Sequence, residues 1–131
     1  MDTKKLGSLG EKIAINFLKK RGYEILDKNY SPKFVSGPLR GEIDVIAKKD
    51  GVIVFIEVKT LVQIGRGRTY AISPEEKVDY SKQKKLIKMA ESWLSERKIS
   101  LDTPWQIDVV SIRIDSDAKK AKIRHFQNAI S

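Results

Sequence analysis

The sequence predicts a single α/β domain in which helices pack on a mixed β-sheet. Residues 6–18 carry apolar side chains at helical spacing, and the segments 42–48, 52–59 and 105–114 are rich in Val and Ile. A second amphipathic helix lies between the last two of these segments. A long helix between two buried strands implies a right-handed crossover that joins parallel neighbours. A chain of 131 residues supports one domain, so we expect residues 1–131 to form a single unit.

The first expected helix has one buried stripe and a clear end. Its stripe consists of apolar residues three and four positions apart, namely Leu6, Leu9, Ile13, Ala14, Phe17 and Leu18. Basic residues at 19–21 complement the carboxyl end of the helix dipole, and Gly22 suits a left-handed cap. A short strand is expected over 23–28. Two prolines and a glycine then predict a loop over 31–40.

The segments 42–48 and 52–59 are predicted to form a hairpin. Asp50 and Gly51 lie between them, and both residue types tolerate the positive φ angles of a type I′ turn. The run from Val52 to Ile56 is apolar at every position, so both of its faces should be covered. This strand is therefore expected inside the sheet.

The second half of the chain begins with an expected flexible basic loop over 60–72. Ser73, Pro74 and Glu76 then form a capping box that starts a helix running to about Lys98. A strand over 105–114 and a short strand over 121–126 complete the chain. The predicted order of elements is α-β-β-β-α-β-β.

The composition narrows the class of function. Lys and Arg number 26 against 17 Asp and Glu, which gives a net charge of +9 and favours a polyanionic partner, either nucleic acid or an anionic membrane face. A basic surface without a specific partner is the alternative. The chain has no Cys and one His, which excludes disulfides, thiolate zinc sites and multi-histidine metal centres. No apolar run approaches the roughly 20 residues of a membrane span, so a cytoplasmic protein is expected.

The hairpin register places charged residues together on one face of the sheet. If Lys49 faces Val52, then Asp44 faces Glu57, and Glu42 faces Lys59 in turn. Like charges directly opposite are destabilising, and a divalent cation would compensate. Two carboxylates with few neutral ligands suit Mg²⁺ or Mn²⁺. The alternative is a Glu42–Lys59 ion pair beside a solvated Asp44.

Three more polar residues fall on helices near this face. Glu11 lies at the edge of the first apolar stripe, from which it could reach the sheet, although a solvent-facing Glu would look the same. Lys82 and Gln83 project within the apolar stripe of the second helix. Lys82 can extend its amine to water, whereas a buried Gln83 amide needs hydrogen-bond partners.

Ordered blocks along nearly the whole chain resemble a known family. They are Leu9–Ala14, Gly22–Tyr23, Asn29–Tyr30, Gly41–Ala47, Val54–Lys59, Lys82–Leu86, Asp108–Val110 and Asn128–Ala129. These blocks look like the YraN-type family, also called UPF0102. That family is grouped with the PD-(D/E)XK, or restriction-endonuclease-like, nucleases, and its pattern is similar to that of archaeal Holliday-junction resolvases.

The resemblance implies a fold, a site and an activity. It makes residues 1–131 a single endonuclease-like domain. Asp44, Glu57 and Lys59 match the superfamily's D…E-x-K core, and Glu11 matches the first-helix acid that completes its metal site. It implies a Mg²⁺- or Mn²⁺-dependent nuclease, with Asp44, Glu57 and Glu11 as metal ligands and Lys59 as the catalytic lysine. By analogy with resolvases it also raises the prospect of a homodimer.

The basic residues expected to contact nucleic acid, with DNA favoured, lie on the glycine-rich loop and on the second helix. They are Arg66, Arg68, Lys82, Gln83, Lys84 and Lys85. Two other readings stay open: a non-catalytic nucleic-acid-binding module with the same fold, and a scaffold protein whose charge aids solubility.

Overall fold

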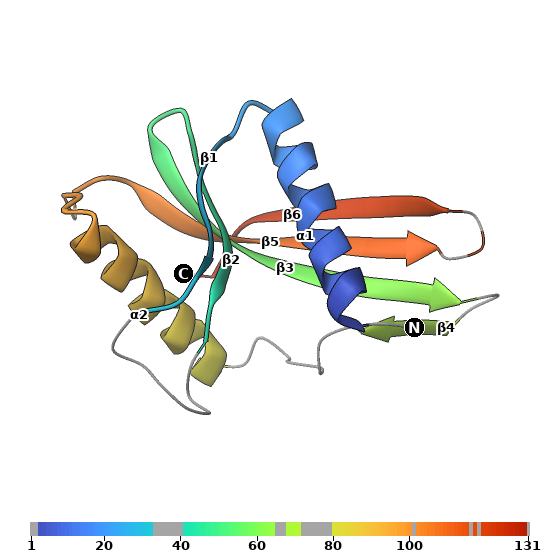
Figure 1. Cartoon of the computed structure of the whole chain (residues 1–131). Helices are drawn as coiled ribbons and strands as arrows, with labels where there is room; N and C mark the ends of the chain where they lie inside the picture. The colour runs from blue at the N-terminus through green and yellow to red at the C-terminus, as the bar shows by residue number, and fades with distance from the viewer. Residues whose placement is uncertain are drawn as a thin grey trace.

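The computed structural model describes residues 3–32, 41–64, 68–71, 80–100, 102–115, 117 and 119–130. Two helices and six strands follow one another along the chain (Figure 1). In order they are α1 (Thr3–Lys20), β1 (Glu24–Tyr30), β2 (Ile43–Lys49), β3 (Val52–Ile64), β4 (Arg68–Ala71), α2 (Tyr80–Glu96), β5 (Trp105–Asp115) and β6 (Lys120–Ile130).

All six strands belong to one mixed sheet. The strand order is β1-β2-β3-β5-β6, and β4 pairs with the C-terminal end of β3. β3 and β5 are parallel, whereas every other pair is antiparallel. α2 connects the two parallel strands, as the sequence predicts. The mixed α/β fold class is therefore confirmed.

The two helices cover opposite faces of the sheet. Alternate residues of β3 belong to two separate cores: Val54 and Ile56 pack with α1 residues such as Leu18, while Ile53 and Phe55 pack with α2 residues such as Trp93. Both faces of this part of β3 are buried, as its uninterrupted apolar run indicates. In Figure 1, α1 crosses the long strands, while α2 lies at the end of the sheet away from β4.

The ends of the predicted elements are confirmed where turn chemistry specifies them. Asp50 and Gly51 have φ angles of 51° and 80°, and the β2–β3 register runs from Lys49↔Val52 to Val45↔Ile56. This is the predicted hairpin. Gly22, at φ 90°, follows α1, and the N–H of Tyr23 donates to the Leu18 carbonyl over 3.0 Å, which closes the helix with a left-handed cap.

Other boundaries differ from the expectation. β3 continues to Ile64 and pairs with β4 where a loop over 60–72 was expected. Leu61 and Val62 extend the β-forming pattern, and Val62 is buried, so strand pairing prevails over the flexibility of the following glycines. β6 is also longer than 121–126. The predicted capping box at 73–76 lies outside the described residues.

α2 ends two residues earlier than expected, because Lys98 adopts a left-handed conformation with φ 56°. The N–H of Ile99 then donates to the Leu94 carbonyl over 2.9 Å, which satisfies a terminal carbonyl of the helix.

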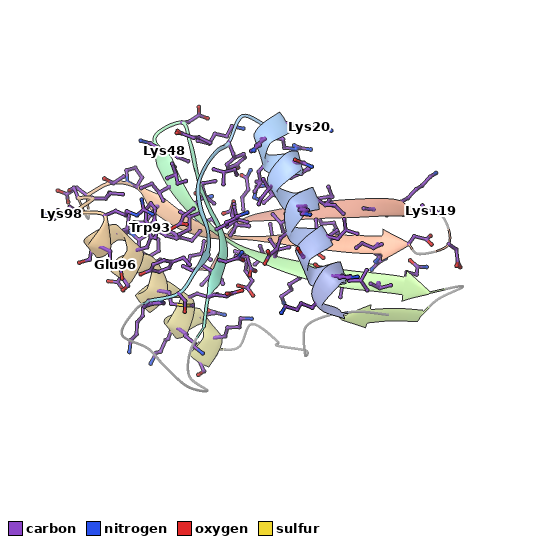
Figure 2. The ribbon with its side chains drawn as sticks, in the orientation of Figure 1. Lys20, Lys48, Trp93, Glu96, Lys98 and Lys119 are labelled. Carbon is purple, nitrogen blue, oxygen red and sulfur yellow. The ribbon has the colours of Figure 1, made fainter. Side chains whose placement is uncertain are left out.

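Hydrogen bonds fasten α2 to the edge strand β1. Trp93 Nε1 and Arg97 both donate to Asp27 Oδ2, over 3.0 and 3.1 Å (Trp93 is labelled in Figure 2).

A buried carboxylate fastens β6 to the sheet. Asp108 is fully buried in β5, where it accepts bonds from the Gln106 side chain and the Asn128 N–H, each over 2.8 Å. His125 Nε2 lies 2.6 Å from its other oxygen. His125 is a strand residue, as the sequence indicates, and the ring contacts of Phe17 and Tyr23 enclose it.

α1 lies very close to β3 at Gly10. A Cβ atom built on Gly10 would lie 2.0 Å from Thr60 Oγ1, so only glycine fits between the helix and β3. We expect Gly10→Ala to lower the free energy of unfolding by about 1–3 kcal/mol through overpacking, measured by urea denaturation.

Gly7 provides the matched control on the same helix. A Cβ at Gly7 meets nothing within 4 Å, so Gly7→Ala should raise the free energy of unfolding by about 0.5–1 kcal/mol through helix propensity. Equal effects of the two substitutions would show that the Gly10–Thr60 contact does not constrain the helix.

Candidate functional site

Asp44 and Glu57 lie at the end of the β2–β3 ladder that is farthest from the turn. The last pair in the register is Val45↔Ile56, and the next residue of each strand carries a carboxylate. Asp44 Oδ2 accepts the N–H of Val58 over 2.7 Å, so the side chain of one strand is held by the backbone of the other. The juxtaposition inferred from the hairpin register is thus present in the fold.

Three carboxylates from separate segments meet at this position. Oxygen atoms of Glu11, Glu42 and Asp44 all lie within 4.8 Å of one another. Glu11 comes from α1, Asp44 from β2, and Glu42 from the residue before β2. We call these three residues the carboxylate cluster.

Burial and mutual repulsion both disfavour the charged forms of carboxylates in this cluster. Burial, and next the charge of Glu57, raise the pKa of Asp44 from its ordinary value of 3.8 to about 8, and Glu11 and Glu42 add to this rise. The Val58 N–H opposes it. Burial also raises the pKa of Glu11, followed by the charge of Glu42, while Lys28 lowers it. A cation bound among these groups would relieve the repulsion.

Glu57 lies beside the cluster and is paired with α2. Its Oε1 accepts a bond from Lys82 Nζ over 3.1 Å, and both side chains are largely buried, at 14% and 19% exposed respectively. Lys82 therefore reaches the site from α2. Lys59 follows two residues after Glu57 and is half-buried on the same face of β3.

The remaining predicted contact residues are distributed around α2. Gln83 and Lys85 are half-buried, and Lys84 is exposed. The stem of Lys85 passes close to Gly41, where an added Cβ would lie 2.9 Å from Lys85 Cε, so it runs near the segment that carries Glu42. Arg66 lies outside the described residues, as does the side chain of Arg68, which begins β4.

Two residues of the site were not assigned from the sequence. Glu42 was expected opposite Lys59, but it precedes the start of β2 and joins the carboxylate cluster. Asn29 has a left-handed backbone, with φ 52°, in β1. With its amide nitrogen assigned toward α1, Asn29 donates to both oxygens of Glu11, over 3.1 and 3.2 Å. The residue type was the one signal in the sequence for this conformation, because Asn tolerates positive φ angles.

Comparison with known proteins decides the family. The family model described as "Uncharacterised protein family UPF0102" matches residues 10–112. The chain belongs to the UPF0102 family. A UPF0102 protein of Alkaliphilus oremlandii is 37% identical over 126 residues, which cover 96% of this chain and 97% of that protein. UPF0102 proteins of Roseiflexus castenholzii and Thermodesulfovibrio yellowstonii are 35% and 40% identical over similar shares of both chains.

The UPF0102 match includes the whole carboxylate cluster, Glu57, Lys59 and Lys82. It confirms the resemblance drawn from the sequence blocks. Among the described residues of this UPF0102 protein, neither helix has the length and apolar character needed to cross a bilayer.

Proposed function

We propose that the protein is a Mg²⁺- or Mn²⁺-dependent nuclease that hydrolyses phosphodiester bonds in nucleic acid, with DNA as the favoured substrate. The observation that carries the proposal is the meeting of Glu11, Glu42 and Asp44, with Glu57 adjacent. Carboxylate oxygens without His or Cys suit hard, octahedral cations.

The donor set fits such an ion in charge as well as in chemistry. Burial, and next the negative charges of Glu57, Glu11 and Glu42, raise the pKa of Asp44, and Lys82 pairs with Glu57. Glu11, Glu42 and Asp44 would hold the ion, and Glu57 would add a further oxygen or orient the site. A bound Mg²⁺ or Mn²⁺ supplies Lewis-acid stabilisation of charge on phosphate oxygens.

The other residues have roles that follow from their placement. Lys59, on the same face as Glu57, would hold its ammonium group near the charge that develops on the reacting phosphate. Asn29 holds the Glu11 carboxylate through both oxygens, and the Asp44–Val58 bond fixes Asp44 on β3. Both contacts orient carboxylates before the substrate binds, which lowers the reorganisation needed for reaction.

The experiment that tests the proposal is a cleavage screen. Branched, flapped, single-stranded and duplex DNA, with RNA counterparts, are incubated with the protein in Mg²⁺, in Mn²⁺ or in EDTA. We expect metal-dependent cleavage of at least one substrate and a loss of at least about 100-fold in Asp44→Ala. Glu91→Gln, which changes an exposed carboxylate on α2, should cut at the wild-type rate.

Two outcomes would contradict the proposal. Cleavage that persists in EDTA or in Asp44→Ala would come from a contaminant or from another site. Salt-sensitive binding without cleavage of any substrate would favour the non-catalytic binding module.

A further inference from the structure

The face of the sheet that carries Glu57 and Lys59 continues onto β5 and β6. Paired residues of neighbouring strands share a face. Glu57 pairs with Val109, which pairs with Phe126; the next row is Lys59, Ser111 and Arg124. The sheet thus forms a continuous surface from the candidate site to its edge strand.

Basic side chains gather on this surface. A third row runs from Leu61 through Arg113 to Lys122, and Arg113 and Lys122 lie directly across from each other. Both are exposed, as is Arg124. We call Arg113, Lys122 and Arg124 the β5–β6 basic face. Two residues further along β5, Asp115 pairs with Lys120 beside the turn.

The basic face is the solvent-facing side of two amphipathic strands. On the opposite side, Val110 and Ile112 are buried, and Ile114 and Ile123 pack against the core under α1. α2 covers the other end of the sheet, since Figure 2 shows Trp93 of α2 and Lys119 of the β5–β6 turn at opposite ends. The three basic side chains of this face therefore lie on paired strands, in a part of the sheet that neither helix covers on this side.

Like charges placed directly opposite one another destabilise a sheet. The Arg113–Lys122 pair is therefore better explained by a ligand than by stability. From strand geometry, Lys122 and Arg124 are about 6.7 Å apart along β6, close to the rise of two phosphates along one strand of duplex DNA. An aromatic ring extends the face: Phe126 is 43% exposed, and the Arg124 guanidinium lies 5.4 Å from its centroid.

We infer that the β5–β6 basic face binds the phosphate backbone of the nucleic acid beside the bond to be cut. This inference rests on the proposed function and deepens it, because it assigns the path of the substrate away from the carboxylate cluster. The row Lys59–Ser111–Arg124 connects the two across only three strands, about 10 Å. An extended polyanion that enters the site from β6 contacts the cations in succession, and Phe126 offers a ring on which an unpaired base stacks.

The test measures the salt dependence of binding, separately from cleavage. Arg113, Lys122 and Arg124 are all changed to Gln, and the affinity for fluorescent duplex and flapped DNA is measured by anisotropy in EDTA from 50 to 300 mM salt. The slope of log affinity against log salt should fall by about 2–3 relative to the wild type, since each lost phosphate contact on duplex DNA removes about 0.9.

A matched control separates position from net charge. Lys12, Lys19 and Lys20 are exposed on α1, on the other side of the sheet. Changing all three to Gln removes three positive charges, as many as the β5–β6 variant loses. Its slope should stay within about 0.5 of the wild-type slope. The β5–β6 variant should melt at or above the wild-type temperature, because a like-charge pair is removed.

Equal slopes for the two triple variants would overturn the inference, as would tighter binding of the wild type to anionic phospholipid vesicles than to DNA. The failure of the proposed function is a separate result. If no substrate is cut but the slope falls as expected, the binding face stands and the nuclease does not. If cleavage depends on metal but the slope is unchanged, only the binding face is wrong.

Discussion

Replacing Lys59 with alanine is expected to reduce the rate of cleavage by at least about 100-fold and to leave folding and DNA binding nearly unchanged. A fixed positive charge at the reacting phosphate can lower the transition-state free energy by roughly 3 kcal/mol. One lysine among 26 basic residues adds little to the affinity for a polyanion. The measurement is the single-turnover rate with saturating enzyme, so that differences in binding do not enter.

The matched control is Lys48→Ala, which removes an exposed lysine from the neighbouring strand. It should cut at the wild-type rate. If Lys59→Ala also does so, then Lys59 serves only as a charge partner for nearby carboxylates, and the catalytic assignment is wrong.

The second large effect is expected at Asp44. In the metal-free protein, Asp44 lies close to three other carboxylates, and the amide introduced by Asp44→Asn retains an oxygen able to accept the Val58 N–H. Asp44→Asn should therefore melt at or above the temperature of the metal-free wild type. Mn²⁺ at a hundredfold excess over its Kd should stabilise the wild type by about 2.7 kcal/mol, and the variant far less. Scanning calorimetry at increasing Mn²⁺ and Mg²⁺ checks both results.

The pH dependence provides an independent check on the same group. Because the pKa of Asp44 in the fold is raised to about 8, the unfolded chain loses this proton at lower pH than the folded protein does. The stability of the metal-free wild type should therefore fall relative to Asp44→Asn as pH rises from about 4 to about 8. The slope for one proton is at most about 1.4 kcal/mol per pH unit.

Asp102→Asn, at an exposed carboxylate, is the control for both measurements and should follow the wild type. A wild type that does not respond to millimolar Mn²⁺, together with a less stable Asp44→Asn, would contradict the metal site. The carboxylates would then have a structural role between the strands.

The predictable part of the site is the part set by local chemistry. Asp50 and Gly51 specify the turn, the turn fixes the register, and the register brings Asp44 next to Glu57. Helical spacing likewise identified the stripe of α1 at Ala14 and Leu18, which are buried, but the expectation was wrong at Leu9, which is 44% exposed. These relations depend on residues within about 15 positions of each other, so no knowledge of the tertiary fold was needed.

The unpredicted part depends on contacts between distant segments. Glu11 meets Glu42 and Asp44 because α1 lies against β3, with Gly10 close to Thr60, and no local pattern encodes this contact. Asp108 meets His125 through pairing of β5 with β6, and each residue alone looked ordinary. The strand β3 continues past Lys59, where a loop was expected because of the glycines that follow, and the partner strand β4 supplies the pairing.

The bond between Asp44 and the backbone of β3 has a consequence for ion selectivity. Asp44 Oδ2 accepts the Val58 N–H, which leaves Oδ1 as the oxygen not used by this bond. A carboxylate held in this way favours monodentate coordination. Ca²⁺ accepts six to eight oxygens and often takes both from one carboxylate, whereas the smaller Mg²⁺ requires near-octahedral geometry and keeps several waters. This bond at the open end of the hairpin would therefore bias the cluster toward the smaller ion.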